Sequence, residues 1–210
     1  FEEMSLSGFS FDAPPDAMLH LSDPPELTLQ VPFTRNLKRR TGGQEKLEKF
    51  IQELRDFAQK TNFTSFFEAH KGTYSKLVSD TYSKMQGVDF IRTLENYYGM
   101  KQKNYTIILV PLFHPGGFGP RIDREGGSNP IFNFIKSLQY LIFNKWSGKS
   151  YEIYNICGPN SVENGIPSFG TQEGFRQLAW HEFGHSFVNP LSESLKNRIK
   201  ISEYSSLFMP

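Results

Sequence analysis

The sequence predicts an α+β fold in which helices surround a small mixed sheet. Three observations predict it: a long central stretch with apolar residues at helical spacing, two short runs rich in β-branched residues, and a helix late in the chain that carries two histidines. The chain has 210 residues, of which 38% are hydrophobic and 21% charged. These proportions are typical of a folded globular protein and exclude a disordered or fibrous chain.

Charge and cysteine content exclude further classes. The chain has 23 basic and 22 acidic residues and a net charge of +1, so no nucleic-acid partner is expected. The apolar runs are too short to cross a bilayer, which predicts no transmembrane segment in this chain. The single cysteine, Cys157, cannot form an internal disulfide and is interpreted as a small core residue at the end of a strand.

Residues 1–43 are predicted to be an irregular N-terminal segment and linker. Two proline pairs interrupt any period, and alternation around Leu29 allows one short strand. Residues 36–43 combine basic side chains with a glycine pair, which is typical of an exposed connection. Residues 44–210 are expected to form the main domain.

Three helices are predicted in the first half of this main domain. Apolar residues recur at steps of three and four over 44–58, with Lys and Glu on the opposite face. A second helix is expected over 63–85, with Gly72 as the point where it could break. A third is expected over 88–98, where Gly99 would supply a left-handed C-cap.

Two strands are predicted after these helices. Residues 105–112 are rich in β-branched residues and contain Pro111, which favours a strand near a sheet edge. Residues 151–157 alternate as a strand does. The pattern of residues 130–143 fits either a helix or a strand.

The last predicted helix, residues 171–190, carries the motif with the clearest chemistry. It begins with a threonine suited to an N-cap and is expected to end at its final proline. His181 and His185 form an HExxH sequence with Glu182. Because residues four apart point to the same side of a helix, both imidazoles can bind one zinc ion, and Glu182 can reach a water beside it without binding the metal.

An HExxH helix that follows a small sheet resembles the zincin superfamily of zinc metallopeptidases. More closely, residues 54–77, 105–122 and 179–190 are similar to an uncharacterised bacterial family of zincin-like proteins. This resemblance spans about residues 42–190. It implies a zincin-like catalytic domain with a zinc cofactor, a peptide or protein substrate, and a secreted or cell-envelope location.

The third zinc ligand distinguishes the zincin subtypes. A metzincin would carry glycine and histidine where this sequence has Val188 and Leu191, so that class is excluded. The remaining option is a glutamate further along the chain. Glu203 has a fitting spacing, but the preferred expectation is a ligand beyond Pro210, in a catalytic domain cut short here. The start at Phe1, without a leader, likewise suggests a processed or partial chain.

Three protein ligands and one open position predict hydrolysis of peptide bonds. Glu182 is expected to act as the general base on a zinc-bound water and then to protonate the leaving amine. His114 and Tyr204 are candidates for stabilising the oxyanion. One of the two predicted strands is expected to pair with an extended substrate. The alternative function is a non-catalytic zincin-like module that binds a peptide or glycan. His20 and His70 are interpreted as packing or surface residues.

Overall fold

A computed structural model of the chain describes residues 2–10, 12–122, 138–140 and 152–196. Within these ranges the structure contains helices and short strands, which confirms the predicted α+β class. The helices are α1 (Glu2–Leu6), α2 (Ala13–Met18), α3 (Arg35–Arg40), α4 (Gln44–Lys60), α5 (Phe63–Met85), α6 (Phe90–Tyr98) and α7 (Gln172–Lys196). The strands are β1 (Asn104–Leu109), β2 (Gly116–Phe118), β3 (Arg121–Ile122), β4 (Leu138–Tyr140), β5 (Glu152–Gly158), β6 (Ser161–Glu163) and β7 (Ile166–Ser168).

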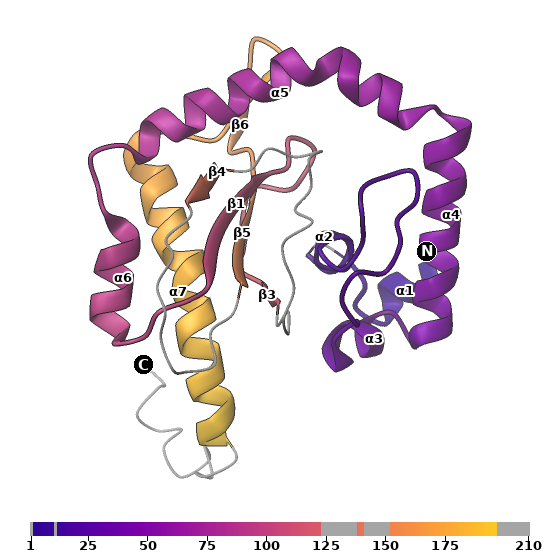
Figure 1. Cartoon of the computed structure of the whole chain (residues 1–210), viewed down its shortest axis with the longest axis horizontal. Coiled ribbons are helices and arrows are strands. Elements are labelled where there is room, and N and C mark those ends of the chain that lie inside the picture. The colour runs from indigo at the N-terminus through magenta and orange to yellow at the C-terminus, as the bar shows by residue number, and fades with distance from the viewer. Residues whose placement is uncertain (1, 11, 123–137, 141–151, 197–210) are drawn as a thin grey trace.

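A mixed sheet lies at the centre of the molecule (Figure 1). Its strand order is β2-β5-β1-β4, and β3 also pairs with β5. Strands β1 and β5 run parallel, whereas β2, β3 and β4 are antiparallel to their partners. Strands β6 and β7 form a separate antiparallel hairpin. The small mixed sheet predicted from the sequence is therefore present, and the described part of residues 130–143 is the strand β4.

Strand β1 is a central strand, not the edge strand that the sequence predicted. It pairs with β5 on one side and with β4 on the other. The ladder is undisturbed because β1 ends at Leu109, so the missing N–H of Pro111 falls outside it. Every residue of β1 and β5 is buried, which explains why both runs are apolar on both faces.

Alternate residues of β5 face two different apolar clusters. Cys157 belongs to a cluster that includes Phe183 of α7 and residues from the last turns of α5 and from α6. Ile156, on the other face, packs with Leu19 and with Val31 from the N-terminal segment. The helices α5, α6 and α7 therefore cover one face of the sheet, and the N-terminal segment covers the other.

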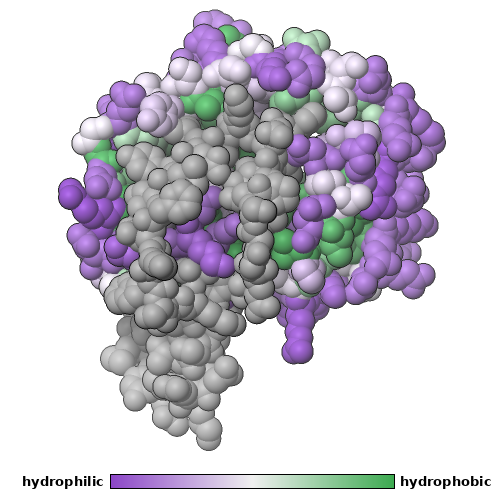
Figure 2. All heavy atoms as spheres, viewed as in Figure 1, coloured by the Kyte–Doolittle hydropathy of each residue, from purple (hydrophilic) through white to green (hydrophobic). Residues whose placement is uncertain are grey.

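Helices α4, α5 and α6 confirm the periodicity of the sequence. Helix α4 buries Leu47 and Ile51, and its outer surface is hydrophilic (Figure 2). Helix α5 continues through Gly72 without a break. Helix α6 ends at Gly99, whose φ of 65° is the left-handed C-cap expected there. None of the helices in the described part combines the length and apolar character that crossing a membrane requires.

The N-terminal segment is helical where irregular structure and an exposed connection were expected. Helix α3 lies within the predicted linker: Thr34 caps it by accepting a hydrogen bond from the backbone N–H of Leu37, and Leu37 is completely buried. The strand expected around Leu29 is a single bridge to Leu21. Two short helices, α1 and α2, precede α3. The division of the chain at residue 43 stays a prediction.

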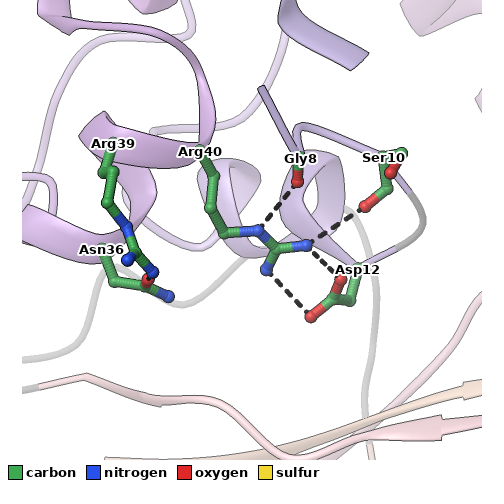
Figure 3. A network of polar contacts seen from close by, with 6 residues as sticks. All are labelled: Gly8, Ser10, Asp12, Asn36, Arg39 and Arg40. Atoms are coloured by element: carbon green, nitrogen blue, oxygen red, sulfur yellow. Dashed lines mark hydrogen bonds and ion pairs between the residues drawn. The ribbon is translucent and has the colours of Figure 1, made fainter. Parts of the chain in front are cut away.

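The basic run is anchored by Arg40, which binds three groups in the segment between α1 and α2 (Figure 3). Its Nε donates to the carbonyl of Gly8 at 2.9 Å, and one terminal nitrogen donates to the carbonyl of Ser10 at 3.3 Å. Both terminal nitrogens also bind the carboxylate of Asp12, at 2.5 and 3.0 Å. A long-range clamp of this kind cannot be predicted from a local pattern, which shows only a cluster of charges.

Asp16 lies beside this clamp and lowers stability at neutral pH. Burial, and then the nearby charge of Asp12, raise the pKa of Asp16 from 3.8 to about 6. The folded state therefore binds this proton more tightly than the unfolded state, so stability falls as pH rises from about 4 to about 6. We expect Asp16→Asn to raise the free energy of unfolding by up to about 3 kcal/mol at pH 8 and by little at pH 4.

Urea denaturation at both pH values measures this effect. The matched control is Asp12→Asn, which breaks the ion pair with Arg40 and should lower the free energy of unfolding. Equal effects of Asp16→Asn at the two pH values would contradict the assignment.

Candidate metal site

Helix α7 carries the HExxH sequence and packs against the sheet. It begins after Thr171, whose side chain accepts a hydrogen bond from the backbone N–H of Gly174, as predicted for an N-cap. It does not end at Pro190 but continues to Lys196. A proline inside a helix removes one backbone hydrogen bond and costs about 3 kcal/mol, but it does not make continuation of the helix impossible.

The structure brings His181 and His185 together on one side of α7. Their Nε2 atoms lie 3.1 Å apart, and their rings are nearly perpendicular. Both residues are exposed, whereas Phe183, on the opposite side of the helix, is buried in the core. The two imidazoles therefore converge on one point outside the helix.

This spacing fits zinc. Two ligands of a tetrahedral zinc ion, each about 2.0–2.1 Å from the metal, have nitrogens about 3.3 Å apart. The observed 3.1 Å between the two Nε2 atoms requires only a small side-chain adjustment. Neutral imidazole nitrogens are also ligands that zinc prefers. His181 and His185 could thus hold two of the positions around one metal ion.

A third ligand is not present among the residues that the structure describes. No group of three His, Cys, Asp or Glu side chains suited to a metal ion occurs in that part of the chain. Glu203, a candidate for the third ligand, and Tyr204, a candidate for the oxyanion, lie outside the described residues. Both assignments stay predictions.

Glu182 lies next to the two histidines on α7 and packs against strand β2. Its residue exposure is only 7%, although both neighbouring histidines are exposed. Burial raises the pKa of Glu182 above its usual value, and the charges of His181 and His185 act in the opposite direction. A carboxyl whose pKa is raised by burial is a candidate for a general base or acid.

Strand β2 lies over Glu182, and two of its three residues are glycine. A Cβ atom on Gly117 would lie 2.6 Å from the Cγ of Glu182, and one on Gly119 would lie 2.2 Å from its backbone oxygen. Ser186, one turn further along α7, has its Oγ 3.5 Å from the carbonyl of Gly119. The helix can approach the strand this closely only because these positions lack side chains.

The terminal strand beside α7 is β2, and neither of the two strands predicted from the sequence is at this edge. Strand β2 pairs with β5, and in the described part of the chain it is the last strand on that side of the sheet. It was missed because three residues give no periodicity. The signal was the glycine cluster at 116–119, which is also typical of a turn.

His114 lies just before β2 and is exposed. Its ring packs on Phe113 with centroids 4.0 Å apart, and its Nδ1 lies 2.9 Å from the carbonyl of Pro115. Its role as the stabiliser of an oxyanion stays a prediction.

The first turns of α7 are held by a reciprocal pair of cations. Arg176 donates from Nε to the carbonyl of Lys84 at 2.7 Å and from a terminal nitrogen to the carbonyl of Gln86. Lys84 in turn donates to the carbonyl of Gly170, just before α7 begins. Arg176 thus satisfies carbonyls at the end of α5, and together with Lys84 it fixes where the histidine-bearing helix begins.

The remaining histidines and the cysteine have structural positions. His20 is buried and Cys157 is fully buried, as the packing interpretation predicted. His70 is exposed and packs on Phe66 with ring centroids 4.3 Å apart. Burial, and then the charge of Glu182, raise the pKa of the Cys157 thiol, so this residue is not a thiolate nucleophile.

Comparison with known protein families assigns most of the chain. A family model described as a domain of unknown function, DUF4932, matches residues 7–147. The chain belongs to the DUF4932 family. The DUF4932 match begins in the N-terminal segment and ends before α7, so the HExxH residues lie outside it. No curated protein and no solved structure matches the chain.

Proposed function

We propose that this chain carries the metal-binding and general-base residues of a zinc-dependent peptidase with a zincin-like fold. The observation that supports this most strongly is the combination on α7 of two converging imidazoles with a buried carboxyl turned toward β2. His181 and His185 would hold the zinc ion together with a third protein ligand, for which Glu203 is the candidate within this chain. A secreted or cell-envelope location is part of the proposal and rests on the resemblance alone.

The chemistry divides between the metal and Glu182. When bound, zinc supplies Lewis-acid activation of a water and of the substrate carbonyl. Glu182 accepts a proton from the attacking water at a carboxylate oxygen and donates it to the leaving amine. Its buried position excludes bulk solvent from this proton, and its raised pKa brings acceptance and donation closer in energy.

The substrate is proposed to be an extended peptide that pairs with β2. This strand is short, lies directly over Glu182, and carries no side chain at Gly116 or Gly117, and Gly119 follows its last residue. A peptide added along it would form backbone hydrogen bonds and would present its carbonyls close to the carboxyl of Glu182.

Zinc binding and hydrolysis test the proposal directly. We expect the purified chain to bind zinc through the two histidines, and His185→Ala to weaken zinc binding at least about tenfold because one of the ligands is lost. Zinc content by mass spectrometry and release of new amino termini from a peptide pool are the measurements. His70→Ala is the control. It removes an exposed histidine that is distant in sequence from His181 and His185, and it should leave zinc binding unchanged.

The outcomes separate the two candidate functions. Zinc bound through the histidine pair without any hydrolysis would favour the non-catalytic module that binds peptide or glycan, which is kept because no third ligand occurs among the described residues. Zinc binding that His185→Ala does not affect would contradict both. A further loss of zinc in Glu203→Ala would identify the third ligand.

A further inference from the structure

We infer that Gly117 and Cys157 form a slot that holds the carboxyl of Glu182 in one position, and that Gly117 is a positioning residue for this carboxylate. The inference has a geometric part, which is independent of any reaction. Its kinetic part rests on the proposed function, since a fixed carboxylate matters only where Glu182 moves a proton.

The two walls of the slot are neighbours in the sheet. Gly117 of β2 and Cys157 of β5 are directly paired in antiparallel register. Directly paired residues point to the same face of a sheet, with Cβ atoms about 4.5–5.5 Å apart. That face is the one covered by α7, because Cys157 belongs to the same apolar cluster as Phe183.

The side chain of Glu182 occupies the place of the missing side chain at position 117. A Cβ atom on Gly117 would lie 2.6 Å from Cγ, 3.0 Å from Cδ and 3.0 Å from Oε1 of Glu182. Three of the five side-chain atoms of Glu182 therefore fill the volume next to the thiol of Cys157. The electrostatic effect of Glu182 on Cys157 agrees with this contact.

Glycine is required at 117 by packing and not by the backbone. Gly116 has a φ of 104°, a conformation that favours glycine, but nothing lies within 4 Å of a Cβ placed on it. Gly117 is not among the residues with positive φ, and the nearest contacts of its Cβ position are all from Glu182. Glycine is thus favoured at 116 by the backbone conformation and required at 117 by packing.

The wall of the slot formed by Cys157 is fixed and closed to solvent. Cys157 is 0% exposed, and its thiol donates to the Oδ1 of Asn155 at 3.1 Å. Asn155 is also 0% exposed, so this side of the slot is part of the core. On the helix side the cover is Glu182 itself, since the exposed face of α7 begins at the adjacent His181.

The only cysteine of the chain is therefore a native reporter for the slot. We expect Glu182→Ala to raise the rate of Cys157 labelling by methyl methanethiosulfonate, under native conditions, by about tenfold or more, because it removes the cover. Glu182→Gln has the same shape and should leave the labelling rate close to that of the parent chain.

Urea denaturation of each variant supplies the rate expected from global unfolding alone, and only labelling faster than that rate counts as opening of the slot. Labelling of Glu182→Ala at the parent rate would overturn the inference. So would equally fast labelling of Glu182→Gln and Glu182→Ala, because the effect would then not depend on the filled volume.

Kinetics add a second readout where hydrolysis is observed. Gly117→Ala should lower kcat more than KM changes and should keep the zinc, because the nearest contacts of the added methyl are with Glu182 and not with the histidines. The thiol experiment needs neither substrate nor metal. The predicted labelling without any peptide cleavage would support the slot and contradict the proposed function. Peptide cleavage without the predicted labelling would contradict the slot alone.

Discussion

Glu182→Gln is expected to lower kcat/KM for peptide hydrolysis by about 10²–10⁴-fold, the usual contribution of a positioned general base. The amide has the size of the carboxyl and can fill the same space against β2, but it cannot accept a proton from water. Because the proposed metal ligands on α7 are His181 and His185 and not Glu182, the zinc content should stay unchanged. A loss of rate with retained zinc would separate catalysis from metal binding.

Glu173→Gln is the matched control for this experiment. Glu173 lies in the first turn of the same helix, is exposed, and accepts a hydrogen bond from Gln177. Its amide variant should hydrolyse peptides at the parent rate. Unchanged hydrolysis in Glu182→Gln, or an equal loss in both variants, would contradict the role assigned to Glu182.

Gly119→Ala is expected to lower the free energy of unfolding by about 3 kcal/mol, at the upper end of overpacking effects. Its Cβ would lie 2.2 Å from the backbone oxygen of Glu182, so β2 and α7 would have to move apart as whole elements. A side chain could rotate out of the way, but a helix backbone held by core packing cannot. Urea denaturation followed by circular dichroism measures the loss.

Gly72→Ala is the opposite case. It lies within α5, and nothing is within 4 Å of the position of its Cβ. We expect this substitution to stabilise the chain by about 0.5–1 kcal/mol, because alanine loses less backbone entropy in a helix than glycine does. Equal stability changes for Gly72→Ala and Gly119→Ala would show that the close contact between β2 and α7 is absent.

The sequence was most informative where one face of an element repeats over several turns. Helices α4 and α5 have long periodic patterns, and their observed bounds agree closely with the predicted ones. Strands β1 and β5 were predicted from their β-branched content. Their order in the sheet could not be predicted, because an apolar run shows that a strand is buried but does not show which strands flank it.

The N-terminal helices were missed because they are short and are stabilised by distant contacts. Helix α2 has prolines in its first turn, which also suits irregular structure, and α3 contains six residues, too few for a period. What holds them is the clamp around Arg40 and the burial of residues such as Leu37. Neither of these contacts can be recognised from neighbouring residues alone.

Half of the candidate site could be predicted, and half could not. The spacing of His181 and His185 on a helix determines their convergence, so the motif was sufficient. The close approach of β2 depends on a strand that lies more than sixty residues earlier in the chain. Glycines at 116–119 were visible in the sequence, but their contact with Glu182 requires the tertiary structure.

Helix α5 also gives the molecule a mechanical property. Its 23 residues form one continuous, curved helix, about 34 Å along its path at 1.5 Å per residue, that crosses from α4 to α7 (Figure 1). One end contacts α4, and the other is tied to the start of α7 through Lys84 and Arg176. A displacement of the N-terminal helices is therefore transmitted to the histidine-bearing helix through α5. The two ends of the molecule are coupled by a continuous helix and not by a flexible loop.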